Sequence, residues 1–379
     1  MTRAAWIVGG GLAGATVSHA LRERGIRPAV FEQAEVTGGL IRAERLNGVI
    51  YEPHGTHAFH TDDEEVWRLV TSLVPFRPYE HRVLTMIEGR LVRWPIMRED
   101  LEQLSFGQRA LDYVASRPPM PVEPGEMNFE DWCLRLMGRD IYEHYVKPYT
   151  EKQWGRAPSE LAADFAPKRV QVRTDGDDRL FKDRFQGFPD GGRGATYTDL
   201  VDRLLGHTEI HMGSHVTLVN LVERLQAVPP AERPSHVVVT APLDDFADCE
   251  LGTLDWRGLR FEHTYIPDVE FAQEREQVNW PGSEFPWIRT HETKHASGQE
   301  IDGTVLTYEF TGAPARYYPV PGIGGVARRL NDAYQELIRT RVEEHGPRVI
   351  FAGRLANFMY YDMDDVIRQA LDLVRGLSL

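Results

Sequence analysis

The hydrophobic pattern at the start of the chain alternates between apolar runs and one amphipathic stretch. Residues 4–8 are apolar, an amphipathic stretch runs to Arg24, and residues 29–31 are apolar again. Gly25 follows the amphipathic stretch, and glycine commonly ends a helix at that position. The pattern therefore predicts a strand, a helix and a second strand in succession.

Two later apolar runs have the same character. Residues 237–243 and 348–353 indicate buried strands that end in loops, and residues from about 364 to 377 are amphipathic. Continuous apolar runs are typical of parallel strands covered on both faces. We therefore expect the first domain to be discontinuous, with its last strand and helix supplied by the end of the chain.

The segments between these runs have two other periodicities. Residues from about 98 to 165 have helical spacing, broken by a proline-rich loop at 118–124, whereas 259–265 and 304–310 alternate as antiparallel strands do. The prediction is an α/β fold: a Rossmann-like dinucleotide-binding domain (1–80, 190–250 and 335–379) with two insertions. One is a helical lid (98–165) and the other an antiparallel-sheet substrate domain (81–97, 166–189 and 255–334).

The loop after the first strand is rich in glycine. Gly9, Gly11 and Gly14 form Gly-X-Gly-X-X-Gly, and Glu32 ends the second strand 18 residues after Gly14. Gly9 allows the tight turn, Gly11 lets the backbone approach a pyrophosphate, and Gly14 lets helix and strand pack closely. The helix N-terminus favours phosphates, and the acid suits a ribose hydroxyl. This context favours dinucleotide binding over a purely structural turn.

Paired glycines bear on which dinucleotide is bound. Gly38 and Gly39 resemble those of FAD-binding proteins of the glutathione-reductase type, although a plain loop would also contain them. The glycine clusters at 191–194 and 322–325 lack the spacing of a second, nicotinamide-binding motif. The sequence thus predicts a flavoprotein that takes electrons from an external reductant, or seldom needs them.

Composition narrows the class of protein. The 379 residues carry a net charge of −14, which argues against a nucleic-acid partner and requires specific arginines to hold any anionic substrate. No apolar stretch is long enough to span a membrane, and no signal region precedes the first strand, so we expect a cytoplasmic protein. Cys133 and Cys249 are far apart and suggest neither a disulfide nor a metal site.

Three histidines, His54, His57 and His60, lie within seven residues. Their i, i+3, i+6 spacing fits no common metal-ligand motif, so no metal is expected. Other dense blocks are 149–156, 317–320 and 353–364, together with several arginines. Taken alone, the aromatic residues of these blocks are equally typical of half-buried positions, and their charged residues of solvated faces. A solvated face is the favoured interpretation for Arg173, Arg179 and Arg184.

Together, these blocks closely resemble the UDP-galactopyranose mutases. The resemblance covers nearly the whole chain and follows the family order: the FAD motif, the histidine loop, residues 149–156, Lys168-Arg169, Arg289, 317–319 and 353–363.

The resemblance implies FAD, active when reduced, and a nucleotide-diphosphate hexose as substrate. Flavin N5 would attack the anomeric carbon, forming a covalent flavin–sugar adduct whose sugar opens and recloses between pyranose and furanose without net redox. UDP-galactose is the first expectation, and a dTDP sugar such as dTDP-fucose is the alternative. The oligomeric state stays open, a homo-oligomer included.

The resemblance also assigns roles to single residues. Arg169 and Arg289 match the two arginines that hold the diphosphate, Tyr149 the tyrosine that stacks on the base, and Trp154 the lid tryptophan beside the sugar. The family's other substrate and flavin contacts match Tyr318, Tyr360 and Asp362 at the diphosphate, and His57, Arg354 and Met363 at the flavin. His54 and His60 are expected to be structural.

Three positions depart from the family pattern. Leu180, Phe185 and Trp287 stand where tyrosines are expected in the nucleotide half of the site. Lost hydroxyl donors there bear on the choice of nucleotide more than on the flavin chemistry. Two other hypotheses stay open: a flavin oxidase or desaturase of the same fold, which the arginines argue against, and a non-catalytic FAD-binding module.

Overall fold

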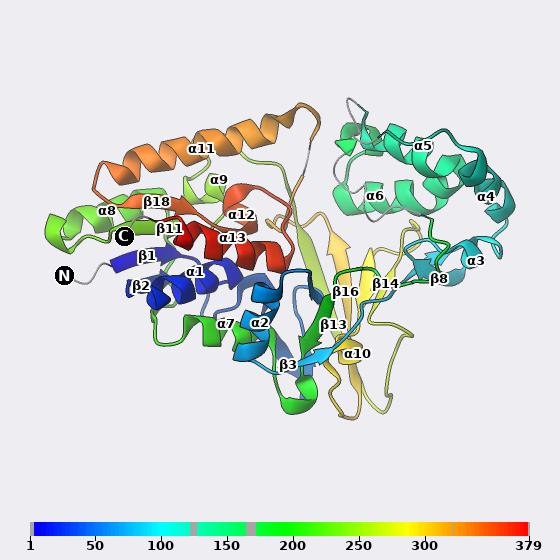
Figure 1. Ribbon diagram of the computed structural model, residues 1–379, viewed down its shortest axis with the longest axis horizontal. Coiled ribbons are helices and arrows are strands. Elements are labelled where there is room, and N and C mark those ends of the chain that lie inside the picture. Colours follow the sequence, from blue (N-terminus) through cyan, green and yellow to red (C-terminus); the bar gives the residue numbers. More distant parts are fainter. Residues whose placement is uncertain (1–3, 122–126, 164–171, 321, 378–379) are drawn as a thin grey trace.

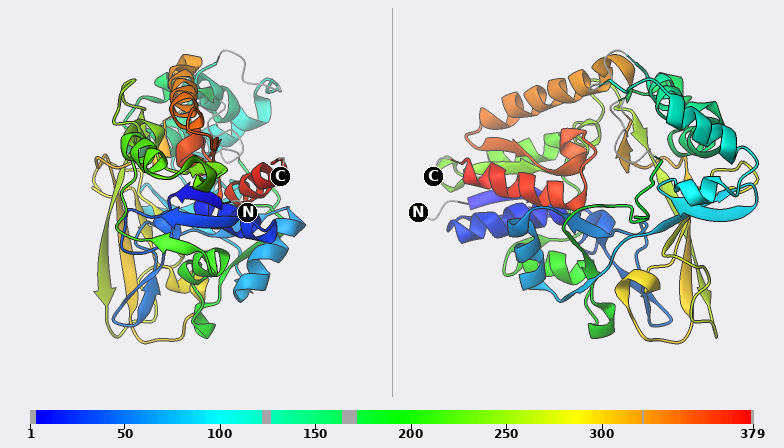
Figure 2. Two further views of the ribbon diagram at one scale, coloured as in Figure 1. Left: turned by 90° about the vertical axis from the view of Figure 1, so that its left-hand side faces the viewer. Right: turned by 45° about the vertical axis from the view of Figure 1, so that its right-hand side comes forward.

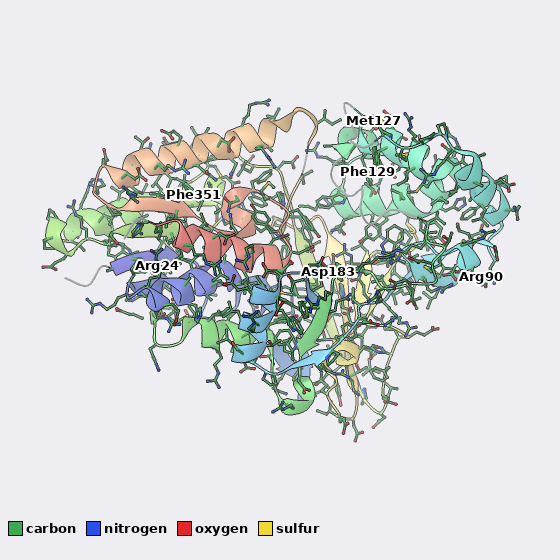
Figure 3. All side chains as sticks on the ribbon, viewed as in Figure 1. Arg24, Arg90, Met127, Phe129, Asp183 and Phe351 are labelled. Atoms are coloured by element: carbon green, nitrogen blue, oxygen red, sulfur yellow. The ribbon has the colours of Figure 1, made fainter. Side chains whose placement is uncertain are left out.

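The computed structural model describes residues 4–121, 127–163, 172–320 and 322–377. Three parts are visible: an α/β half, a mixed sheet and a group of helices above that sheet (Figures 1 and 2). Asp183 lies where the α/β half meets the sheet, whereas Met127 and Phe129 lie in the helical group (Figure 3). The predicted fold class is confirmed.

A five-stranded parallel sheet forms the centre of the α/β half. Its order is β10–β2–β1–β11–β18, from segments far apart in sequence: β1 (Ala4–Val8), β2 (Arg27–Phe31), β10 (Glu209–His211), β11 (His236–Val239) and β18 (Arg348–Phe351). Successive side chains of β2 enter opposite cores, Val30 on one face and Phe31 on the other. Both faces are therefore covered, as parallel sheets require.

Helices on the two faces complete these cores. On the Val30 face the core includes residues of α1 (Leu12–Glu23), α2 (Glu64–Leu73), α7 (Tyr197–Leu205) and α13 (Met363–Arg375). On the other face it includes residues of α8 (Leu218–Ala227), α9 (Leu243–Phe246), α11 (Val326–Glu343) and α12 (Gly353–Asn357). Helix α11 crosses the boundary predicted after residue 334, and the domain ranges themselves stay a prediction.

The second large sheet has six strands in the order β13–β16–β15–β14–β7–β8: β13 (Leu259–Ile266), β16 (Thr304–Thr311), β15 (Arg289–His291), β14 (Gln277–Asn279), β7 (Val83–Ile87) and β8 (Arg90–Trp94). Neighbours are antiparallel except β14 and β7, which are parallel. Smaller sheets pair β3 (Glu44–Leu46) with β4 (Val49–Tyr51), β9 (Phe185–Pro189) with β5 (Phe59–Thr61) and β6 (Phe76–Pro78), and β12 (Trp256–Arg257) with β17 (Tyr318–Pro319).

The helical group has a core of its own. It comprises α3 (Arg98–Leu101), α4 (Gly107–Ser116), α5 (Phe129–Ile141), a π-helical turn (Tyr142–Val146) and α6 (Lys147–Trp154). Phe106, Trp132 and Tyr145 are buried in this core, and Trp154 packs at its edge nearest the second sheet. Among the described helices, none is both long and apolar enough to cross a membrane.

The end of α6 is attached to the second sheet. The Lys152 ammonium donates to the carbonyl oxygens of Trp280 (2.7 Å) and Gly282 (2.8 Å). Arg257 donates to the carbonyl oxygens of Gln153 (2.6 Å) and Lys152 (2.8 Å). The positions of Tyr149 and Trp154 relative to the sheet are therefore fixed by hydrogen bonds at the C-terminus of their helix. α10 (Lys294–Ser297) lies beyond β15.

Candidate active site

The glycine-rich loop lines a cavity of about 500 Å³ at the carboxyl end of the parallel sheet. Gly9 has φ +106°, and a Cβ there would lie 2.2 Å from the Thr240 hydroxyl. A Cβ on Gly14 would lie 2.0 Å from the carbonyl oxygen of Gly9. Both positions therefore exclude any side chain, and α1 begins directly behind the loop, as a pyrophosphate site requires.

Glu32 reaches the same cavity from the end of β2. Its carboxylate accepts hydrogen bonds from the backbone N–H groups of Gly10 (2.7 Å) and Ala34 (2.8 Å), and the side chain is buried. These two bonds hold the acid at the cavity wall beside the glycine loop. The ribose contact of Glu32 stays a prediction.

The paired glycines pack against the first motif. Gly38 has φ +102° and pairs with Gly11, and a Cβ on Gly39 would lie 3.1 Å from the Cα of Gly11. Both line the cavity. These glycines thus extend the cavity wall past the α1 N-terminus without placing side chains in the cavity. The residues present therefore fit a long dinucleotide such as FAD.

The opposite end of the cavity carries His57, Arg354, Asp362 and Met363. Met363 is the first residue of α13, whose positive N-terminal dipole faces the cavity. Burial, Arg354 and His291 lower the pKa of His57 to about 4, so its ring is neutral at pH 7.

The three histidines of the loop at 54–60 have separate partners. His54 Nδ1 lies 2.7 Å from the Tyr317 hydroxyl. The backbone N–H of His57 donates to the Glu52 carboxylate at 2.7 Å. His60 lies 3.2 Å from Asp183 and 3.6 Å from Asp362. Within the described ranges, no three His, Cys, Asp or Glu side chains are grouped to hold a metal ion.

Arg289 stands at the end of β15 facing the helical group. Its Nε–H donates to the Tyr149 hydroxyl at 2.7 Å, and Nη1 lies 3.4 Å from both oxygens of Glu309. Burial would lower the pKa of Arg289, but the Glu309 carboxylate outweighs burial and raises it well above the usual value. The guanidinium is therefore permanently charged, and its two contacts fix its orientation.

Aromatic residues connect Arg289 with the cavity. Tyr318 and Tyr360 are stacked with ring centroids 5.5 Å apart, and Trp154 lies 5.9 Å from Tyr318. The Arg354 guanidinium lies 5.4 Å from the centre of the Tyr318 ring and 4.9 Å from that of Tyr360. Arg354 also lines the cavity, so the aromatic group and the dinucleotide cradle share a wall.

Each of the three departures from the family pattern has a contact within the fold. Phe185 stacks on Trp67 of α2 at 5.5 Å, so its aromatic ring has a structural contact there. The Leu180 N–H donates to the His81 carbonyl oxygen at 2.8 Å, and Trp287 packs on Tyr308. Arg169 lies outside the described residues.

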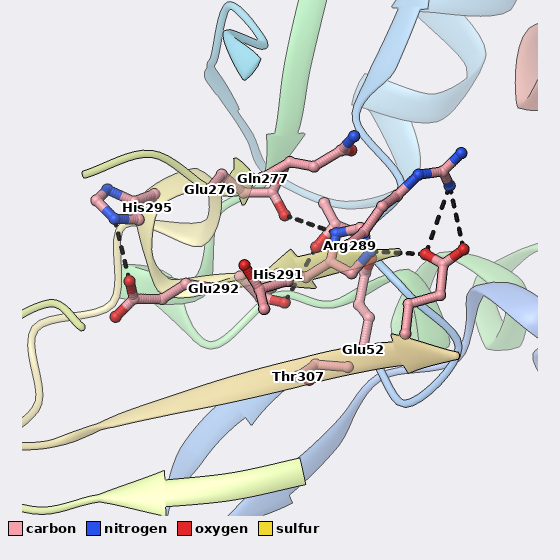
Figure 4. Close-up of polar contacts among 12 residues, drawn as sticks. Glu52, Glu276, Gln277, Arg289, His291, Glu292, His295 and Thr307 are labelled. Carbon is pink, nitrogen blue, oxygen red and sulfur yellow. Dashed lines mark hydrogen bonds and ion pairs between the residues drawn. The ribbon is translucent and has the colours of Figure 1, made fainter. Parts of the chain in front are cut away.

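The site contains a buried acid–imidazole cluster that the sequence analysis did not identify. His291 lies between Glu309 (Nε2 to Oε2, 2.9 Å) and Glu276 (Nδ1 to Oε1, 3.7 Å), and Glu276 also contacts His81 at 3.2 Å (Figure 4). All four side chains are at most 5% exposed. The sequence feature that could have indicated this cluster is Arg-X-His at 289–291. Its pairing with Glu309 can be recognised only once the strand register is known.

Two protein-family models match parts of this chain. A family model described as UDP-galactopyranose mutase matches residues 144–360, and one described as an NAD(P)-binding Rossmann-like domain matches 7–73. The chain belongs to the UDP-galactopyranose mutase family. It is therefore an enzyme of a flavin-dependent isomerase class, as the sequence analysis predicted.

Two relatives match nearly the full length. A dTDP-fucopyranose mutase of Escherichia coli is 30% identical over 97% of this chain and 96% of its own. The protein named "Probable UDP-galactopyranose mutase" of Klebsiella pneumoniae is 32% identical over 96% of this chain and 92% of its own. Membership of the family thus leaves open which nucleotide and which sugar are used.

Solved structures share the fold more widely. A reduced UDP-galactopyranose mutase matches with a TM-score of 0.76 and 14% identity over 98% of this chain and 95% of its own. A putrescine oxidase bound to putrescine matches with 0.60 and 13% identity over 99% of this chain and 98% of its own. Because an amine oxidase has the same fold, function has to be argued from the site.

Proposed function

We propose that the protein interconverts the pyranose and furanose forms of a nucleotide-diphosphate hexose with FAD bound in its reduced state. The observation that supports this most directly is Arg289, a charged and oriented guanidinium beside Tyr149, next to an aromatic wall shared with the dinucleotide cavity. An oxidase acting on an amine would have little use for a buried cation at this position.

FAD would be held along the whole cavity. Gly9, Gly11 and Gly14 would accommodate the pyrophosphate, Glu32 a ribose, and His57 and Arg354 the isoalloxazine end. Gly38, Gly39 and Met363 would complete this contact surface. When bound and reduced, FAD would supply the nucleophile, N5, that bonds to the anomeric carbon while the sugar ring opens and recloses, without net redox change.

The protein would supply position and charge. Arg289 would donate hydrogen bonds to the diphosphate oxygens. It would also stabilise the negative charge that develops when the nucleoside diphosphate leaves. Tyr318 and Tyr360 would flank this group, Tyr149 would stack on the base, and Trp154 would cover the sugar. Arg169 is assigned to the second diphosphate contact by its match to the family pattern alone.

Asp362 has a different role from the other polar residues. A carboxylate would repel a diphosphate, but Asp362 lies 3.6 Å from His60 and caps the N-terminus of α13. We infer that it orients this helix end and His60 at the flavin rim and does not bind the substrate directly.

The substrate is proposed to be UDP-galactose, with dTDP-fucose as the alternative. Both names occur among the relatives, at nearly equal identity. The test is to incubate photoreduced enzyme with the furanose form of each nucleotide sugar and separate the products by chromatography. We expect conversion to the pyranose form without consumption of a nicotinamide cofactor, and none with oxidised flavin.

The result also discriminates between the candidates. Titration of the reduced enzyme with UDP and dTDP reports the preferred base independently of turnover. If every nucleotide-galactose and nucleotide-fucose is left unchanged by the photoreduced enzyme, the proposal is wrong. Bleaching of the flavin by an amine under anaerobic conditions would then favour the oxidase hypothesis.

A further inference from the structure

His291 occupies the centre of the buried cluster behind Arg289. Its Nε2 lies 2.9 Å from Glu309, and Glu309 in turn lies 3.4 Å from the Arg289 guanidinium. On its other side, Nδ1 lies 3.7 Å from Glu276. Arg289 is thus the outermost member of a series of alternating cations and carboxylates that extends into the sheet (Figure 4).

The strand register produces this series. Arg289 pairs directly with Glu309 across β15 and β16, and His291 is two residues further along β15. Because side chains at i and i+2 of a strand point to the same face, Arg289 and His291 both reach Glu309. A shift of one residue would separate all three side chains.

Charge balance gives the cluster its stability. Burial lowers the pKa of His291, but its interactions with the Glu276 and Glu309 carboxylates outweigh this and raise it to about 9. Burial raises the pKa of Glu309, but Arg289 and His291 outweigh it and lower the value. At pH 7, two cations and two carboxylates therefore balance one another, because Glu276 also has a lowered pKa despite its burial.

The histidine loop rests on the same cluster. Gly55 has φ +85°, which favours glycine, and a Cβ there would lie 3.6 Å from Nε2 of His291, in van der Waals contact, so the loop packs directly on the cluster. Thr56 and His57 follow Gly55 directly, and His57 lines the cavity wall. The cluster therefore supports a residue on the cofactor side as well as Arg289 on the substrate side.

We propose that His291 is the positioning residue for Arg289: its ring holds the Glu309 carboxylate against the guanidinium and so keeps the guanidinium aimed at the diphosphate. This inference rests on the function proposed above. His291 touches neither substrate nor cofactor in this scheme and acts through Glu309. Without its positive charge, Glu309 would share a buried site with Glu276 and turn away from Arg289 or take up a proton.

Other titratable groups face His291 and have to be accounted for. Besides Arg289, Glu309 and Glu276, they are His81, which precedes β7, and Glu52 and His57 from the histidine loop. Burial lowers the pKa of His81 and His57 and raises that of Glu52. Of the three histidines, His291 is the one whose pKa is raised, to about 9, so its ring loses its charge as the pH rises from 7 to 10.

The test is the affinity of the flavin-loaded enzyme for UDP and dTDP, measured by calorimetry from pH 7 to 10. In the wild type, we expect affinity to fall as the pH rises through about 9. His291→Gln keeps a polar side chain without the charge, and should weaken binding at pH 7 by about tenfold, within the range of couplings in one hydrogen-bonded network. It should also remove the decline near pH 9.

His81→Gln is the matched control, because His81 contacts the same Glu276 but not Glu309. It should retain wild-type affinity and the wild-type pH profile. Equal losses in both variants, or a His291→Gln profile that parallels the wild type, would overturn the inference while leaving the proposed function in place. If wild-type enzyme binds neither nucleotide at any pH, the proposed function fails first, and this inference with it.

A second measurement covers a His291→Gln variant that does not fold. Nuclear magnetic resonance of the wild-type histidine rings should show one ring that titrates near pH 9, and Glu309→Gln should lower that midpoint. A midpoint unmoved by Glu309→Gln would show that the two side chains are not coupled, and would also refute the inference.

Discussion

Replacement of Arg289 tests the substrate side of the site most directly. Arg289→Ala removes the hydrogen bond to Tyr149 and the ion pair with Glu309. Loss of one oriented electrostatic contact to a developing charge costs about 10²–10³-fold in turnover. We therefore expect reduced enzyme carrying this change to lose most of its mutase activity.

The structure also indicates what this variant should retain. Glu309 would stay buried but keep His291 at 2.9 Å, so the stability cost should be about 1–3 kcal/mol, below the ~3–5 kcal/mol for a buried charge left without a partner. None of the removed contacts reaches Gly9 or Glu32. The protein should therefore fold and keep its yellow flavin absorbance.

Two further variants sharpen the experiment. Arg289→Lys keeps the charge but lacks the fork that reaches Tyr149 and Glu309 together, and should lose about tenfold in activity. Arg184→Ala removes an exposed arginine of the same chain and should behave as wild type. Activity is measured as furanose-to-pyranose conversion with photoreduced flavin, and stability by urea unfolding. Arg289→Ala activity within twofold of the wild type would remove Arg289 from the site.

Three further predictions follow from particular contacts. Leu180→Tyr should lower the dissociation constant for a UDP sugar if the missing hydroxyl limits binding; an unchanged constant would exclude that explanation. Gly14→Ala should abolish flavin retention on gel filtration, because its Cβ would lie 2.0 Å from the Gly9 carbonyl oxygen. Stability should fall as the pH rises through about 9, because the pKa of His291 is raised from 6.5. That contribution, about 3 kcal/mol, is complete below pH 6.5. Urea unfolding of wild type and His291→Gln should therefore converge by pH 10, and a constant gap would contradict the assignment.

Local sequence chemistry was sufficient to predict the strand–helix–strand unit and its glycine-rich loop. Gly9, Gly14 and Glu32 act within one strand–helix–strand unit, so their spacing contains the geometry. The pairing of Arg289 with Tyr149 and Glu309 joins residues far apart in the chain, and only the resemblance to the family indicated that Arg289 belonged to the site.

The parts that were not predicted depend on strand register or on packing. His291 and Glu309 lie on β15 and β16, and Glu276 directly precedes β14. The alternation of these segments is equally typical of a solvated sheet face, and Gly55 of the histidine loop packs on His291. Phe185 was interpreted as a change in the substrate pocket, but it stacks on Trp67. No pattern along the chain indicated that contact, because α2 and β9 are separated by more than a hundred residues.

The order of segments in the parallel sheet has a consequence for synthesis of the protein. The strand that carries the glycine loop is translated first, yet its neighbour β11 starts at His236, and the cavity wall also needs residues 353–363. A nascent chain thus exposes an unfinished nucleotide cavity until residues 353–363 have left the ribosome. Flavin loading is therefore expected after residues 353–363 have joined the glycine-rich loop at the cavity, and a truncation before residue 353 should yield a colourless protein.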